Sequence, residues 1–129
     1  MKLKIISSQK VVLEEEDVQS VSIPGTEGQM QILPHHENLV STIEIGSLGI
    51  ETKGEKTTFL VNGGFVVIRD NEVLILVDNA EVPARIIKEE IEQAIQNATD
   101  KLSTITDPKE LIRLEKQLRY ERFKKDQVS

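Results

Sequence analysis

The hydrophobic pattern of this chain changes at Pro83, and this change limits the folds open to it. Before Pro83, short runs rich in valine and isoleucine, such as 65–68 and 73–77, alternate with turn-forming residues. Short β-branched runs are typical of strands. After Pro83, apolar residues recur at three- and four-residue steps from Ile86 to Leu102, which indicates an amphipathic helix. We therefore predict an α+β protein with two domains, residues 1–82 and 83–129.

Turn-forming residues divide the first domain into several short strands. Asp70-Asn71, between two apolar runs, is the clearest hairpin, and Gly46 and Asn62-Gly63-Gly64 are expected to separate further strands. Many short strands at such spacing predict an antiparallel sandwich or a flattened barrel. Because the chain has three Phe, one Tyr and no Trp, valine and isoleucine have to fill most of the core.

A second helix is predicted after a break at residues 103–106. Asp107 is a good N-cap and Pro108 suits the first helical position. Leu111, Leu114 and Leu118 then form an apolar stripe. A short connection favours an antiparallel hairpin of two helices. Because the two helices share only one thin seam, we expect the hairpin to be conditionally stable and therefore movable.

The net charge of −6 is unevenly distributed along the chain. Residues 1–82 hold six basic and thirteen acidic side chains, whereas residues 83–129 hold ten basic and nine acidic ones. The acidic body and the scarcity of aromatic residues argue against a nucleic-acid partner. The lack of cysteine excludes disulfides and thiolate metal sites. With no membrane-spanning run and no signal-peptide pattern, we expect a bacterial protein on the cytosolic side.

Two motifs resemble those of the epsilon subunits of F-type, proton-translocating ATP synthases, which are equivalent to the mitochondrial delta subunit. The first is segment 22–40, SIPGTEGQMQILPHHENLV. The second is Asn62-Gly63-Gly64-Phe65, followed by strands and then by Ala80-Glu81 before the helices. The resemblance covers essentially the whole chain. It implies a flattened ten-stranded antiparallel β-sandwich followed by a C-terminal two-helix antiparallel hairpin.

The resemblance also implies a function. The chain is similar to a non-catalytic rotor subunit of the central stalk, and such a subunit couples the gamma subunit to the ring of c subunits during ATP synthesis. The C-terminal helices of such a subunit inhibit ATP hydrolysis when they extend and meet the alpha and beta catalytic subunits. Such a protein lies peripherally at the cytoplasmic face of the bacterial inner membrane and meets the membrane only indirectly, through the c-ring. This role implies no cofactor, metal or nucleic acid.

Position by position, the resemblance assigns three surfaces. The loop that contacts the c-ring and gamma comprises Gly28, Gln29, Met30, Ile32, Leu33, Pro34 and His36. In this loop Gln29 stands where an acidic residue is common. The turn that faces gamma contains Gly63 and Gly64. The regulatory latch comprises Lys109, Arg113, Lys116, Arg119 and Arg122.

Other chemical interpretations receive less support from the residues. Some epsilon subunits bind ATP through an Ile-Asp-x-x-Arg-Ala stretch, but here Ile87 replaces the carboxylate and Glu90 the arginine, so no ATP binding is expected. His35 and His36 have no third ligand at a suitable spacing, so no metal site is expected. The basic charge of the last helix could also serve only the helix dipole. The alternative function is a free-standing β-sandwich that binds a small ligand, with the helices as a lid.

Overall fold

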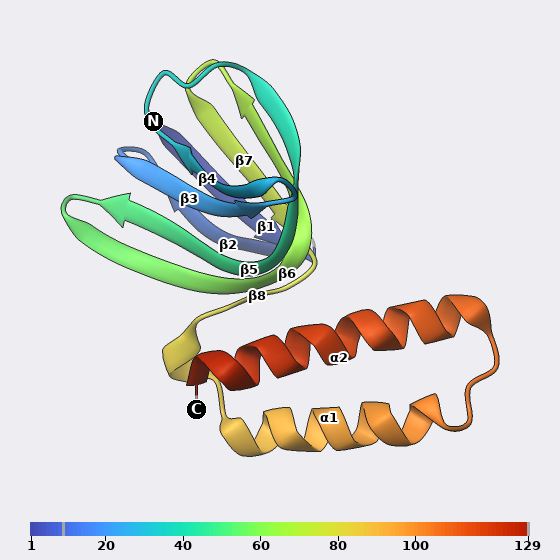
Figure 1. Cartoon of the computed structure of the whole chain (residues 1–129). Helices are drawn as coiled ribbons and strands as arrows, with labels where there is room; N and C mark the ends of the chain where they lie inside the picture. The colour runs from blue at the N-terminus through green and yellow to red at the C-terminus, as the bar shows by residue number, and fades with distance from the viewer. Residues whose placement is uncertain (9, 129) are drawn as a thin grey trace. The chain divides into compact units, whose positions relative to one another are not determined.

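The computed structural model describes residues 1–8 and 10–128, which form two compact units, Met1–Val82 and Pro83–Ser129. The first unit contains eight strands, and the second contains a 3₁₀ turn and two helices (Figure 1). In chain order the elements are β1 (Lys2–Ser7), β2 (Lys10–Glu15), β3 (Ser20–Gly25), β4 (Gly28–Ile32), β5 (Leu39–Thr52), β6 (Glu55–Arg69), β7 (Glu72–Val77), β8 (Ala80–Glu81), η1 (Pro83–Arg85), α1 (Lys88–Leu102) and α2 (Pro108–Val128). None of the described helices is long and apolar enough to cross a membrane.

One sheet contains all the strands of the first unit. Its order is β2-β1-β7-β6-β5-β3-β4, and β8 pairs with β6 outside this path. Strands β1 and β7 run parallel, while the remaining described pairs are antiparallel. Strands β1 and β7 are far apart in the sequence, so no tight hairpin imposes opposite directions on them.

The sheet forms a sandwich because β5 and β6 are long and bend together. The first part of β5 pairs with residues 64–68 of β6, which pair in turn with β7. The second part of β5 pairs with residues 55–62 of β6 and also with β3. Figure 1 shows this strand pair curving from one layer into the other. Counting each long strand once in each layer gives the ten strands of the predicted sandwich, and the prediction of a sandwich followed by two helices is confirmed.

Glycine permits the bend in β6. Gly63 has φ 106°, and a Cβ on Gly64 would lie 2.0 Å from the carbonyl oxygen of Leu76 in β7. A positive φ and a close backbone approach are the two conditions that favour glycine, and both are present here. The prediction that Asn62-Gly63-Gly64 separates two strands is wrong, because β6 continues through these residues. Gly46 likewise lies inside β5, where the side chain of Pro24 packs against it, and it does not end a strand.

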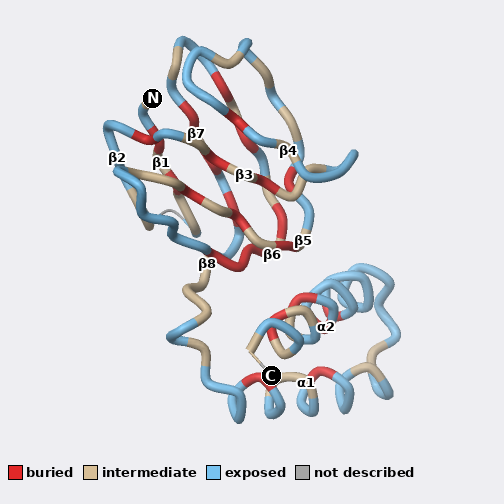
Figure 2. The backbone as a smooth tube through the Cα atoms, turned by 60° about the vertical axis from the view of Figure 1, so that its left-hand side comes forward, coloured by how far each residue is buried: buried red, intermediate tan, exposed pale blue. Residues whose placement is uncertain are grey.

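The hydrophobic core of the sandwich lies between the two halves of the bent sheet (Figure 2). Alternate residues of the strands point into it, as in β7, where Val73, Ile75 and Val77 are buried. Besides these, the core contains Leu3, Ile5, Val18, Val21, Ile23, Ile32, Ile43, Leu48, Ile50, Phe59, Val61, Val66 and Ile68. Aliphatic residues therefore provide nearly all of the apolar burial, as the composition predicts.

The hairpin between β6 and β7 forms as predicted. Asp70 and Asn71 have φ values of 51° and 64°, as a type I′ turn requires at both central positions. Asx residues tolerate this left-handed conformation better than other non-glycine residues. The pairing of Arg69 with Glu72 closes the turn.

The helical unit is an antiparallel hairpin with a narrow seam. Ala98 of α1 packs with Leu114 and Leu118 of α2, and the partly buried Ile95, Leu102 and Ile105 extend this cluster. Helix α2 begins at Pro108 as predicted, and Asp107 Oδ1 accepts a hydrogen bond of 3.1 Å from the backbone N–H of Lys109. Helix α1 begins at Lys88, later than the change of pattern at Pro83, because residues 83–85 form η1 and Ile87 is extended.

The bend at Gly64 provides a first prediction. Gly64→Ala places a Cβ against the backbone of β7, which cannot rotate away, so we expect a loss of about 2 kcal/mol or more in the free energy of unfolding, measured by urea titration. Gly49→Ala in β5 is the matched control, because its Cβ would lie 3.7 Å from the nearest side-chain atom. Equal stability of the two variants would contradict the role assigned to Gly64.

Candidate functional site

The predicted contact loop lies in β4 and the segment that follows it. Gly28, Gln29 and Leu33 are exposed, and Met30 is partly buried. Ile32 is different, because it is fully buried in the sandwich core. Side chains alternate between the two faces of a strand, so Ile32 points inward while its neighbours point outward. The expectation that Ile32 belongs to the contact surface is therefore corrected, and its side chain is part of the core.

The segment after β4 is fixed to the β6–β7 turn. The backbone N–H of His35, a residue with φ 66°, donates a hydrogen bond of 2.8 Å to Asn71 Oδ1. The backbone N–H of Asp70 donates one of 3.1 Å to Asn38 Oδ1. His36 Nδ1 lies 2.8 Å from the carbonyl oxygen of Glu37. These contacts hold the predicted loop residues Pro34 and His36 on a defined surface.

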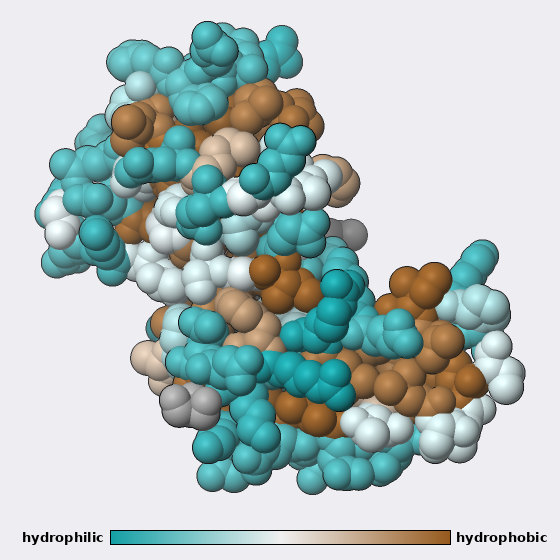
Figure 3. Space-filling view, viewed as in Figure 1, coloured by the Kyte–Doolittle hydropathy of each residue, from teal (hydrophilic) through white to brown (hydrophobic). Residues whose placement is uncertain are grey.

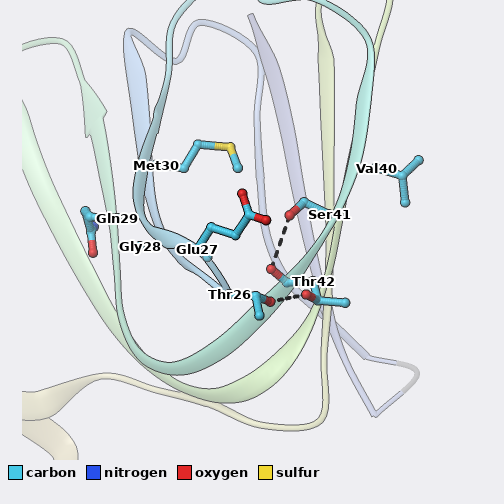
Figure 4. Close-up of a pocket in the computed structure, with 9 residues that line it drawn as sticks. Thr26, Glu27, Gly28, Gln29, Met30, Val40, Ser41 and Thr42 are labelled. Atoms are coloured by element: carbon cyan, nitrogen blue, oxygen red, sulfur yellow. Dashed lines mark hydrogen bonds between the residues drawn. The ribbon is translucent and has the colours of Figure 1, made fainter.

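A groove of about 580 Å³ lies beside the same loop (Figure 4). It is lined by Gly25, Thr26, Glu27, Gly28, Gln29, Met30, Val40, Ser41 and Thr42. The hydroxyl groups of Thr26 and Thr42 hydrogen-bond to each other, and the carboxyl group of Glu27 points toward Ser41 in Figure 4. Glu27 is the one charged residue of this lining. The groove therefore offers hydroxyl groups and one carboxylate to a polar partner.

Gly63 and Gly64 lie at one end of an exposed apolar surface. The strand register places Phe65 beside Leu76 and Ile6, and it places Val67 between Val40 and Leu74. The apolar face, as we call it, comprises Ile6, Val11, Val40, Phe65, Val67, Leu74 and Leu76. Phe65 and Val40 are 53% and 68% exposed. A contiguous exposed apolar face of this kind marks a protein-interaction surface.

Charged residues border the apolar face. Lys2 Nζ lies 3.8 Å from Glu72 Oε1. Arg69 of β6 lies opposite Glu72 of β7 in the strand register. This face was not predicted from the sequence. Its signal is present in the run 65–68 and in the run 73–77, which are apolar at successive positions rather than at alternate ones. Such a run fits a strand with apolar residues on both faces.

The five predicted latch residues are all exposed on α2, but they do not share one face. At about 100° per residue, Lys109, Arg113 and Lys116 fall on one side of the helix, whereas Arg119 and Arg122 continue around it. Ile112, which is 69% exposed, lies beside Lys116 and Arg119 on the helix surface, whereas Leu111 lies on the side of the seam residues Leu114 and Leu118. The predicted latch residues therefore form a basic stripe that winds around the helix, with Ile112 beside it.

The positions that carry the family's ATP motif lie at the start of α1. Ile87 is the N-cap residue and is 51% exposed, and Glu90 lies exposed in the first turn. Among residues 1–8 and 10–128, no group of three or more histidine, cysteine, aspartate or glutamate side chains is placed to hold a metal ion.

Fold and surfaces together define a class of small two-part protein: a bent β-sandwich with an exposed apolar face, followed by a separate α-hairpin. The family model for the β-sandwich domain of the ATP synthase delta/epsilon chain matches residues 1–83. The ATP synthase epsilon chain of Pelotomaculum thermopropionicum is 35% identical over 105 residues, which cover 81% of this chain and 78% of the relative. The ATP synthase epsilon chain of Herpetosiphon aurantiacus is 35% identical over 119 residues, which cover 92% of this chain and 87% of the relative. The chain belongs to the ATP synthase delta/epsilon family and is an epsilon subunit of the F-type enzyme.

Solved structures agree with this assignment. A chain in the mitochondrial ATP synthase OSCP/F1/c-ring structure of Euglena gracilis matches with a TM-score of 0.78 and 26% identity, over 98% of this chain and 80% of that one. A chain of the central stalk and c-ring structure of the Tetrahymena thermophila mitochondrial enzyme matches with a TM-score of 0.63. At 16% identity, the second match shows the shared fold alone.

Adjacent residues of the predicted loop are expected to respond differently to truncation. Ile32→Ala removes fully buried methyl groups, so we expect the free energy of unfolding to fall by about 3 kcal/mol. Leu33→Ala is the control, because Leu33 is 51% exposed and its truncation is expected to change stability by about 0.5 kcal/mol or less. Chemical denaturation of both variants measures the difference, and a larger loss at Leu33 would contradict the assignment.

Proposed function

We propose that this chain is a non-catalytic rotor subunit that links the gamma subunit to the c-ring during ATP synthesis. The observation that carries the proposal is the pair of adjoining surfaces on one rigid sandwich. The apolar face and the groove differ in chemistry, because the groove adds hydroxyl groups and one carboxylate, and Val40 belongs to both of them. A small body that has to be held by two different partners at once needs such a pair of surfaces.

The apolar face is the proposed docking surface for gamma. Its residues lie on the paired strands β1, β2, β5, β6 and β7, so the shape of the surface is set by backbone hydrogen bonds. Phe65 and Leu76 lie side by side near its centre. Large apolar side chains at the centre of an interface contribute most of its affinity. Gly63 and Gly64 support this surface by positioning β6 against β7, and their own contact with gamma remains part of the proposal.

The groove and the loop beside it are the proposed contact with the c-ring. Gly28, Gln29, Met30, Leu33, Pro34 and His36 form the loop portion. Glu27 supplies a carboxylate to the groove that Gln29 also lines, and Gln29 is the position at which the family commonly has an acidic residue. A polar surface suits this contact, because the parts of a membrane ring that leave the bilayer are in water. The membrane is then reached only through the c-ring, and the protein lies peripherally at the cytoplasmic face of the bacterial inner membrane.

The helical hairpin is the proposed regulator of ATP hydrolysis. Its narrow seam stabilises the hairpin weakly, so extension of α2 costs little. The basic stripe, with Ile112 beside it, would then meet acidic surfaces of the alpha and beta catalytic subunits. Complementary charge of this kind sets the rate and the specificity of docking.

A substitution on the apolar face tests the link to gamma. Phe65→Asp places a charge where the proposed interface is dry, so we expect the affinity for gamma to fall by about thirtyfold or more. Thr58→Asp is the matched control, because Thr58 is exposed on the other half of the same strand. Titration calorimetry of each variant with purified gamma compares the two. Equal affinities would contradict the assignment of the apolar face.

Removal of the helices tests the regulatory role. A complex reassembled with residues 1–82 is expected to hydrolyse ATP about fivefold faster or more than one with the full chain, and ATP synthesis is expected to persist. A double variant, Lys109→Gln with Arg113→Gln, is expected to release part of the same inhibition, while Lys10→Gln with Lys56→Gln on the sandwich is the control. Unchanged hydrolysis after truncation would contradict the latch and leave the coupling role in place.

A further inference from the structure

Two asparagine side chains join the loop after β4 to the turn between β6 and β7. Asn71 Oδ1, in the turn, accepts the hydrogen bond of 2.8 Å from the backbone N–H of His35. Asn38 Oδ1, in the loop, accepts the hydrogen bond of 3.1 Å from the backbone N–H of Asp70. Each segment therefore provides one side-chain oxygen to the backbone of the other. We call Asn38 and Asn71 the asparagine pair.

The loop has a backbone conformation that needs an additional contact. The backbone N–H of His36 donates a hydrogen bond of 3.1 Å to the carbonyl oxygen of Leu33, which closes a four-residue turn. Inside this turn His35 has φ 66°, a left-handed conformation that is unfavourable for a residue with a Cβ. The N–H that Asn71 binds belongs to this same residue. The hydrogen bond therefore stabilises the loop at the residue where its conformation is least favourable.

The loop connects the two layers of the sandwich. Strand β4, before the loop, pairs with β3, whereas the start of β5, after it, pairs with residues 64–68 of β6. In Figure 1 the loop passes beside the β6–β7 turn. This turn is also bound to β1, because the carbonyl oxygen of Asn71 accepts a hydrogen bond of 3.2 Å from the backbone N–H of Lys2. The asparagine pair thus attaches the loop to the layer that carries the apolar face.

The asparagine pair is expected to fix the position of the loop more than the stability of the domain. Both hydrogen bonds are exposed, so water competes with each of them and each contributes little to the free energy of unfolding. They join the same two segments, so either bond keeps the groups of the other within reach. The core that stabilises the sandwich lies between the layers and does not include either asparagine.

We propose that Asn38 and Asn71 are positioning residues that hold the loop of the proposed c-ring contact in a fixed place relative to the apolar face. A loop attached only at its two ends can adopt many conformations, whereas the asparagine pair attaches this one between its ends. A loop held in its bound conformation loses less entropy when a partner binds, which raises the affinity. This role rests on the proposed function, but the attachment of the loop is a property of the isolated chain.

Amide hydrogen exchange of the full-length chain, measured by NMR, tests the attachment without a partner. Asn71→Gly removes the acceptor and suits the φ of 64° at this position, so we expect the His35 amide to exchange about fivefold faster. Asp70→Gly is the matched control, because it lies in the same turn with φ 51° and keeps the backbone N–H that binds Asn38. Asn71→Asp keeps an acceptor oxygen and is expected to preserve slow exchange. Equal exchange of the His35 amide in Asn71→Gly and Asp70→Gly would overturn the proposal.

Binding of the two proposed partners separates a positioning role from a merely structural one. In the double variant Asn38→Ala with Asn71→Gly, we expect the affinity for the purified c-ring to fall about tenfold, while the affinity for gamma stays within about twofold. A structural role would lower both affinities together. Unchanged affinity for the c-ring, or an equal loss for both partners, would therefore overturn the proposal.

A single variant covers the case in which the double variant does not fold. Asn38→Ala alone is expected to lower the affinity for the c-ring about threefold and to leave gamma binding unchanged, and an unchanged c-ring affinity would overturn the proposal. Failure of the unsubstituted chain to bind the c-ring would contradict the proposed function together with the positioning role. Intact c-ring binding in every variant would overturn the positioning role alone, so the two failures are distinguishable.

Discussion

The close approach of β6 to β7 at Gly64 is the constraint on which the sandwich depends. A Cβ at this position would lie 2.0 Å from the carbonyl oxygen of Leu76, so only glycine allows the two backbones to meet there. This close backbone contact lets β5 and β6 bend as a pair and continue from one layer into the next. One continuous sheet thereby encloses a core of aliphatic residues and also turns Phe65 and Leu76 outward.

The two units differ in how much hydrophobic core holds each of them together. The sandwich has an extensive hydrophobic core and a continuous hydrogen-bonded sheet, which suit the coupling role proposed for it. The hairpin has a small core along one seam. Its stability is therefore set by few contacts, and the proposed extension of the hairpin requires only a few kcal/mol. The proposed function, in which the subunit couples rotation at all times and inhibits hydrolysis only at some times, needs this asymmetry.

Much of this fold can be predicted from the sequence, because its signals are local. The Asp70-Asn71 turn and the cap of α2 at Asp107 follow from the residues themselves. The passage of β6 through Gly63 and Gly64 could not be predicted, because glycine signals a turn and a bend equally well. The inward side chain of Ile32 and the burial of Lys124 depend on long-range packing. For the same reason the apolar face appears only once the strand register is known.

The affinity of the gamma subunit for residues 1–82 alone, compared with that for the full chain, tests the central claim most directly. All the buried residues of the sandwich core lie within this fragment, so it is expected to fold by itself. The account predicts one-to-one binding by calorimetry, with dissociation constants that agree within about twofold. A folded fragment that does not bind gamma, while the full chain does, would contradict the claim that the sandwich alone attaches this subunit to the rotor.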